Sequence, residues 1–145
     1  MFLGKFSRTL DDRSRFSLPS TFTGQLSSGA YLTQGWDRNL QVLTGGAFQQ
    51  IYRAAASLNI TNPAARLLLR LILGTAQELD VDANGQLTIP EELKEFANLK
   101  EDIFLIGQGE YFEIWAPDLW NKQEAQLRDA EANASRFSAL TVTAR

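Results

Sequence analysis

The stretch Leu10-Asp11-Asp12-Arg13-Ser14-Arg15-Phe16-Ser17-Leu18-Pro19 is repeated in pattern by Val81-Asp82-Ala83-Asn84-Gly85-Gln86-Leu87-Thr88-Ile89-Pro90. Each copy has an apolar residue, an aspartate, three further residues and a long polar side chain. An apolar residue, a residue with a hydroxyl group and a second apolar residue follow, and a proline ends the motif. The two copies are separated by a constant 71 positions. A repeat of this length predicts two copies of one small folding unit.

The repeat continues beyond the motif, with one residue inserted. Leu40-Gln41-Val42 matches Phe112-Glu113-Ile114, and Phe48 matches Trp120, each at 72 positions. Units of roughly 70 residues rarely bury enough apolar surface to be stable without a disulfide or a metal. The chain has no Cys and no His, which excludes disulfides and ordinary zinc sites. We therefore expect the copies to fold as one interdigitated body, or to recruit neighbouring subunits.

The local sequence predicts an α+β fold in which two repeated β units form a compact barrel-like core. Each unit reads as a strand, a turn, a strand, a short helix and two further strands. We place the first unit at residues 5–47 and the second at 76–119, joined by connecting helices at 48–75. Residues 120–145 are expected to form a C-terminal helix and a mobile tail.

The connecting helices carry clear start signals. Thr44 is suited to cap the first helix, and Pro63 stands at the first position of the second. Residues 64–73 are apolar on nearly every side of that second helix, which predicts contacts beyond one small unit, most simply with another subunit. A final helix is expected to begin near Pro117. From Ala130 the composition becomes small and polar, and the last residues are expected to form the tail.

Charge is divided unevenly along the chain. The net charge of the whole chain is −3, but residues 1–74 hold eight basic and three acidic side chains, a net charge of +5. Residues 75–145 hold six basic and fourteen acidic side chains, a net charge of −8. This asymmetry favours a polyanion partner for the first half. The alternative, a solvated surface of mixed charges, stays open. Four of the cations flank the first motif: Lys5, Arg8, Arg13 and Arg15.

The first motif has the chemistry of a DNA-reading turn. A two-stranded ribbon fits the major groove of DNA, and arginine suits bidentate contact with phosphate or guanine. We expect Arg13 and Arg15 on the turn, with Lys5 and Arg8 on the adjoining strand, to contact DNA. The alternative for Arg15 is a structural brace to Asp11 across the turn, and both roles are compatible if Arg13 is the side chain that faces solvent.

Several short motifs, in fixed order and spacing, carry a resemblance to a known family. They are Met1-Phe2-Leu3-Gly4, the stretch from Leu10 to Arg15, Asn62-Pro63-Ala64-Ala65-Arg66, Asp82-Ala83-Asn84-Gly85, Ile89-Pro90 and Phe112-Glu113-Ile114-Trp115. Each copy resembles the SpoVT–AbrB swapped-hairpin unit. The pair resembles the MraZ family, bacterial DNA-binding regulators linked to the division and cell-wall gene cluster.

The resemblance implies a function and a difference between the copies. It implies a sequence-specific DNA-binding transcriptional regulator that assembles as a ring-shaped homo-oligomer and recognises direct repeats in a promoter, usually to repress. The family pattern DxxxR is intact from Asp11 to Arg15. In the second copy, Asp82 and Gly85 keep the turn, but Gln86 stands where the arginine is expected. We therefore expect the second copy to be mainly architectural.

Other function classes fit less well. The chain has no His, no Cys, no Gly-rich phosphate loop and no Gly-x-Ser-x-Gly elbow, so we expect no catalytic residue, no metal and no cofactor. An alternative from another class is a structural or adaptor oligomer without specific DNA binding, which the missing second arginine favours. Arg66 and Arg70, four residues apart on one helix face, are expected to pair with acidic side chains of the second copy.

The sequence also predicts a location. No stretch approaches the roughly 18–20 apolar residues needed to cross a bilayer. The first residues lack the long apolar core of a signal peptide. We expect a cytoplasmic, nucleoid-associated protein whose partners are double-stranded DNA and further copies of itself, with no membrane partner.

Overall fold

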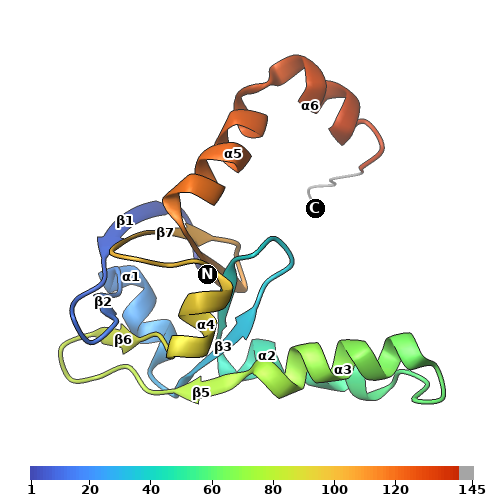
Figure 1. Cartoon of the computed structure of the whole chain (residues 1–145), viewed down its shortest axis with the longest axis horizontal. Helices are drawn as coiled ribbons and strands as arrows, with labels where there is room; N and C mark the ends of the chain where they lie inside the picture. Colours follow the sequence, from blue (N-terminus) through green and yellow to red (C-terminus); the bar gives the residue numbers. More distant parts are fainter. Residues whose placement is uncertain (141–145) are drawn as a thin grey trace.

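The structure is a computed structural model that describes residues 1–140. A body built from both repeats carries two helical projections, the α2–α3 hairpin and the α5–α6 arm (Figure 1). The first unit contains β1 (Lys5–Thr9), β2 (Arg15–Ser17), α1 (Ser20–Thr23), a 3₁₀ turn (Gly24–Leu26), β3 (Ala30–Gln34) and β4 (Leu40–Leu43). The hairpin consists of α2 (Gly45–Ala56) and α3 (Pro63–Thr75).

The second unit repeats this order. It contains β5 (Gln77–Leu79), β6 (Gln86–Thr88), α4 (Glu91–Phe96), β7 (Asp102–Gly107) and β8 (Tyr111–Trp115). The arm follows as α5 (Pro117–Arg128) and α6 (Ala130–Phe137). The strands and short helices that the sequence predicts in each copy are therefore present in the same order.

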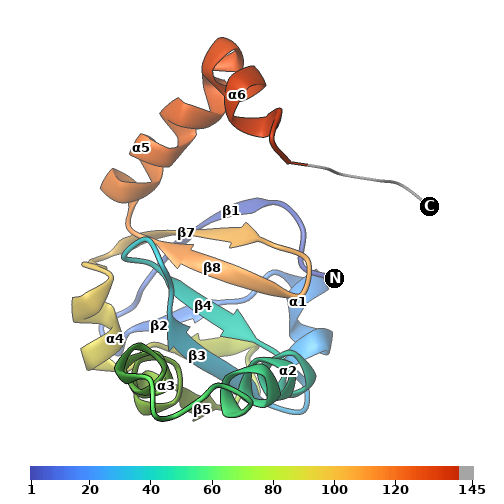
Figure 2. The ribbon, with the colours of Figure 1, turned by 90° about the vertical axis from the view of Figure 1, so that its right-hand side faces the viewer.

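The two units exchange strands. The larger sheet has the order β1-β7-β8-β4-β3-β5, and β2 pairs with β6 in a separate two-stranded ribbon (Figure 2). The outer strand β1 pairs with β7 of the second unit, and β5 pairs with β3 of the first. The sheet order is unchanged when equivalent strands of the two units are swapped, so an approximate two-fold axis relates the units. The α+β class and the swapped-hairpin architecture are confirmed.

The hydrophobic core is shared by the two units. Phe22 of the first unit lies 5.0 Å from Phe112 of the second and 5.0 Å from Phe2, measured between ring centroids. Phe16 and Leu87, which are partners in the β2–β6 ribbon, are 1 % and 0 % exposed. Because neither unit closes this core alone, the expectation of one interdigitated body is met.

The connecting helices begin as the sequence predicts. The Thr44 hydroxyl oxygen accepts a hydrogen bond from the backbone N–H of Ala47 at 3.2 Å, and α3 begins at Pro63 behind the Asn62 cap. The apolar side of α3 is not covered within one copy, since Leu67 is 68 % exposed. None of the helices in residues 1–140 is long and apolar enough to cross a bilayer.

The C-terminal segment differs from the expectation. Helix α5 begins at Pro117 as expected, and a second helix, α6, which the sequence does not predict, occupies the stretch from Ala130. Small and polar residues indicate exposure, and alanine, glutamate and arginine also favour helix. The Asn133 side-chain amide donates to the Gln126 carbonyl at 2.8 Å and so fixes the elbow between the two helices. The last residues of the expected tail, 141–145, lie outside the described residues.

Candidate nucleic-acid interface

The first turn is organised by the carboxylate of Asp11. Its Oδ1 accepts the backbone N–H groups of Arg13 and Arg15, each at 2.9 Å, and its Oδ2 accepts the Arg15 Nε–H at 2.8 Å. The hydrogen bond from the Arg15 backbone, aided by its guanidinium and the Arg13 backbone, holds the pKa of Asp11 below its usual 3.8. The structure therefore contains the brace between Asp11 and Arg15.

The second turn has the same backbone and no arginine. Asp82 Oδ1 accepts the backbone N–H groups of Asn84 and Gln86, each at 2.9 Å. Gly85 has a φ of 73°, and Ser14, at the equivalent place in the first turn, has a φ of 59°. Within residues 1–140 the Gln86 side chain makes no hydrogen bond. The second turn thus keeps its geometry without presenting a cation.

The two turns lie at opposite ends of the β2–β6 ribbon. The strands are antiparallel, with Arg15 opposite Thr88 and Ser17 opposite Gln86. The first turn therefore meets the end of the ribbon where the chain enters α4, and the second meets the end where it enters α1. Each end is a separate candidate for contact with DNA.

The two arginines of the first turn differ in whether other groups of the chain bind their side chains. The Arg13 side chain is exposed and makes no hydrogen bond or ion pair with other groups of the described chain. Arg15 is 34 % exposed and engages Asp11 through Nε alone, so the terminal nitrogens of its guanidinium stay available. The expectation that Arg13 faces solvent while Arg15 is braced agrees with this geometry.

Lys5 and Arg8 lie away from the tip of the first turn. Lys5 Nζ forms an ion pair with Glu124 Oε2 of α5 at 3.0 Å. That hydrogen bond is the main cause of a Glu124 pKa below its usual 4.5. Arg8 Nε donates to the Ser17 carbonyl at 2.8 Å, at the other end of the ribbon from the first turn. The structure thus brings Arg13 and Arg15 together but not Lys5 and Arg8 with them.

A cation that sequence reasoning missed lies beside the first turn. Lys94 of α4 donates from Nζ to the hydroxyl oxygen of Ser14 at 3.1 Å. The Ile89 backbone N–H also donates to the Ser14 carbonyl, at 2.9 Å, which holds the start of α4 near this turn. Lys94 stands 80 residues from Ser14, so no local pattern indicates the contact. Only the exchange of elements between units brings the two together.

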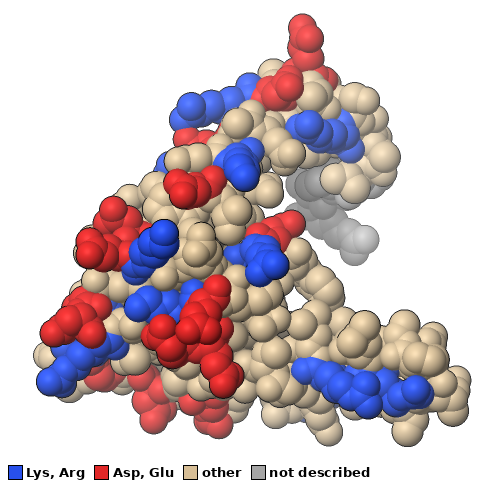
Figure 3. Space-filling model, viewed as in Figure 1, with Lys and Arg blue, Asp and Glu red and all other residues tan. Residues whose placement is uncertain are grey.

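The remaining basic candidates and the tryptophans occupy different places. Arg66 donates to the Ile60 carbonyl at 2.9 Å, and Arg70 forms no ion pair within the described chain, so the expected pairing with acidic residues of the second copy is wrong for a single chain. Trp115 and Trp120 are buried with ring centroids 5.5 Å apart. On the face shown in Figure 3, the α2–α3 hairpin carries basic but no acidic side chains.

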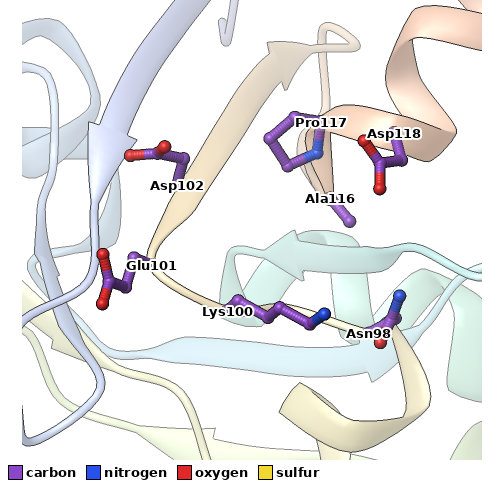
Figure 4. A pocket seen from close by; sticks show the side chains of 7 residues that line it. All are labelled: Asn98, Lys100, Glu101, Asp102, Ala116, Pro117 and Asp118. Atoms are coloured by element: carbon purple, nitrogen blue, oxygen red, sulfur yellow. The ribbon is translucent and has the colours of Figure 1, made fainter.

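A surface pocket of about 460 Å³ lies between the end of α4 and the start of α5 (Figure 4). Its charged lining consists of the three carboxylates of Glu101, Asp102 and Asp118 and the ammonium of Lys100. No group of His, Cys, Asp or Glu side chains among residues 1–140 is placed to hold a metal ion. The exposed turn, and not this acidic pocket, is the surface suited to a nucleic acid.

Comparison with known proteins agrees with the repeat. The family model described as MraZ protein, antitoxin-like, matches residues 1–71 and again residues 72–141. The chain is 36 % identical over 138 residues to the transcriptional regulator MraZ of Roseiflexus castenholzii, covering 95 % of this chain and 94 % of that protein.

Two further relatives give the same result. The transcriptional regulator MraZ of Mycolicibacterium smegmatis is 36 % identical over 141 residues, which are 97 % of this chain and 94 % of that protein. The transcriptional regulator MraZ of Mycobacterium tuberculosis is 33 % identical over 140 residues, which are 97 % of each chain. With its two matched units and these relatives, the chain belongs to the MraZ family, a family of transcriptional regulators and not of enzymes.

Proposed function

We propose that this protein is a sequence-specific DNA-binding transcriptional regulator of the division and cell-wall gene cluster type. It recognises direct repeats in a promoter as a ring-shaped homo-oligomer and acts as a repressor. The observation that carries the proposal is the first turn, where Asp11 holds Arg15 in place and Arg13 projects without a partner in the described chain. The relatives named as transcriptional regulators support it.

The first turn is suited to enter the major groove. An arginine held by a carboxylate through Nε keeps its remaining donors in a fixed fork, which matches guanine edges or phosphate oxygens. Arg15 supplies this fork, and Arg13 reaches from the exposed tip. Lys5 and Arg8 remain proposed contacts further along the strand. The ion pair of Lys5 with Glu124 is exposed, and solvent and salt weaken such pairs, so DNA competes with it readily.

The second unit acts mainly as a scaffold. Asp82 and Gly85 keep its turn closed, and Gln86 adds no charge there. A glutamine amide is able to read adenine by a bidentate contact, so Gln86 retains some capacity for base recognition. Gln86 contributes a minor share of the affinity.

Assembly into a ring rests on the uncovered apolar surface of the α2–α3 hairpin. Leu67 of α3 is 68 % exposed, and Ile60, in the loop between the two helices, is 64 % exposed. Trp36 lies outside the hairpin, in the turn between β3 and β4, and is 70 % exposed. Trp36 also borders a pocket of about 180 Å³ whose apolar lining includes Ile51 and Leu71. Exposed apolar surface of this kind is typical of protein interaction sites. Linked subunits multiply weak single contacts, which suits a site made of repeated sequences. With DNA as partner, we place the protein in the cytoplasm, associated with the nucleoid.

A structural or adaptor oligomer without specific DNA binding is the second candidate. The observation that favours it is the missing cation of the second turn, where Gln86 and Asn84 replace the two arginines. The positive net charge of the first half favours DNA instead.

Selection of bound sequences from random duplex DNA separates the two candidates. The full-length protein is expected to enrich a short repeated sequence, and its affinity for that duplex should fall linearly with the logarithm of salt concentration, on a log–log plot. Failure to enrich any sequence, with binding no tighter than to random duplex, would overturn the proposed regulator and favour the adaptor.

A further inference from the structure

The short helix of each unit lies against the turn of the other unit. Lys94 of α4 bonds to Ser14 in the first turn at 3.1 Å. The position equivalent to Lys94 in the first unit is Thr23, at the same separation of 71 residues. Its hydroxyl oxygen lies 4.0 Å from where a Cβ on Gly85 would stand, in the second turn. Each end of the ribbon is therefore built from both units.

Because each end of the β2–β6 ribbon is built from both units, the two ends differ more in charge than the turns alone do. The turn and the facing helix position supply three cations at the first end: Arg13, Arg15 and Lys94. The equivalent residues at the second end are all neutral: Asn84, Gln86 and Thr23. At the first end Asp11 is already satisfied by Arg15, whereas Asp82 at the second end faces no arginine. Only one end combines several cations.

The ammonium group of Lys94 is held by a hydrogen bond, but no carboxylate of the described chain neutralises its charge. Its partner is a hydroxyl, and it forms no ion pair among residues 1–140, although Glu91 lies one helical turn before it. An ammonium has three N–H donors, so the bond to Ser14 leaves two of them free. The side chain is half-buried, which limits its motion.

We propose that Lys94 contacts a DNA phosphate beside the first turn, so that the DNA-binding surface of each subunit is a composite of both units. The inference rests on the proposed function. An ammonium is a point charge without the planar fork of arginine, so Lys94 serves affinity and position while the arginines read bases. The second unit, whose own turn carries no cation, thus supplies Lys94 beside the turn of the first unit.

The test measures affinity against salt concentration for full-length Lys94→Gln and Lys94→Met, the latter keeping the apolar stem. The probes are the duplex enriched by selection and a duplex of random sequence. Loss of one phosphate contact should weaken binding by the same factor on both probes and lower the salt slope by about one unit. Lys94→Arg should keep the parent slope. The matched control is Lys122→Gln, which removes an exposed cation from α5.

Three results would overturn the inference. In the first, both Lys94 variants bind like the parent while Arg13→Ala binds weakly, which leaves the proposed function standing. In the second, Lys122→Gln changes the slope as much as Lys94→Gln does, which indicates a general effect of net charge. In the third, affinity falls only on the selected duplex with an unchanged slope, which excludes a phosphate contact. If Arg13→Ala and Arg15→Ala also bind like the parent, the assignment of DNA binding to the first turn fails as well.

Discussion

At the scale of single residues, the arginine at position 15 is the difference that gives the first turn its brace. Asp11 and Asp82 each close a turn through two backbone hydrogen bonds at 2.9 Å, so the carboxylate is a structural element of both copies. Only Asp11 also binds a guanidinium. With Gln86 in place of arginine, the second aspartate keeps the fold and loses the positioning role.

The contact between Asp11 and Arg15 predicts a pH-dependent contribution to stability. The folded pKa of Asp11 lies below the unfolded value of 3.8, so its stabilisation is complete above that pH and is lost as pH falls through the folded pKa. In Asp11→Asn the amide oxygen keeps the turn, but Arg15 is released. The melting temperature of the variant should lie below that of the parent at neutral pH, and the gap should close in acid.

Thermal denaturation of the two proteins between about pH 7 and pH 3 measures this gap. High salt should reduce the gap, because the pair is partly exposed and is screened. A gap of constant size across the whole range would show that the charge of Asp11 does not contribute. Asp82→Asn is the control for loss of charge without loss of an arginine contact.

At the scale of elements, the turns depend on a residue with positive φ. Gly85 occupies this position in the second turn with a φ of 73°, and Ser14 occupies it in the first with a φ of 59°. A side chain in this conformation is strained. The first copy tolerates the strain at Ser14, whose hydroxyl accepts from Lys94 and whose carbonyl accepts from Ile89.

Gly85→Ala should therefore destabilise the protein by about 1–2 kcal/mol through backbone strain. No clash contributes, since the nearest atom to the added methyl group would be the Thr23 hydroxyl oxygen at 4.0 Å. Chemical denaturation measures the change in free energy of unfolding. The control is Gly46→Ala in α2, which has open space around it and should stabilise by up to about 1 kcal/mol. Equal effects of the two substitutions would contradict the strain argument.

The repeat and the turn chemistry predict the local elements well, because aspartate, glycine and proline act on their neighbours. They also predict the Thr44 cap of α2 and the start of α3 at Pro63. Local patterns do not specify which unit a strand pairs with, so they do not predict the contact between Lys94 and Ser14. Composition likewise does not predict helix α6, which begins at Ala130 in a stretch of small and polar residues. Tertiary contacts decide these features.

At the scale of the whole molecule, two projections leave the body in different directions (Figure 1). The α2–α3 hairpin is basic and apolar, with no acidic residue between positions 38 and 77. The α5–α6 arm exposes Leu127 and Phe137, at 60 % and 53 %. Contacts between unlike surfaces of successive copies generate rings when the rotation closes, which is consistent with the proposed assembly.

Leu67→Asp should dissociate this assembly without unfolding the subunit. Leu67 is 68 % exposed within one copy, so the charge is tolerated there and is costly only in an apolar contact. Analytical ultracentrifugation measures the mass of the assembly, and circular dichroism checks the fold. Leu3→Asp places the same charge at a leucine of the body that is 63 % exposed and should leave the assembly intact. An unchanged mass for Leu67→Asp would exclude this face of α3 from the interface.

We propose that the first turn binds DNA and that the second serves the fold. The most direct test compares Arg15→Ala and Gln86→Ala, which truncate equivalent side chains, on one selected duplex. Arg15→Ala should weaken binding by roughly 1–3 kcal/mol, as expected for a lost base contact. Gln86→Ala should change binding by less than about 0.5 kcal/mol, the range of an ordinary surface substitution. Equal losses in the two variants would show that both turns read DNA and would contradict the account.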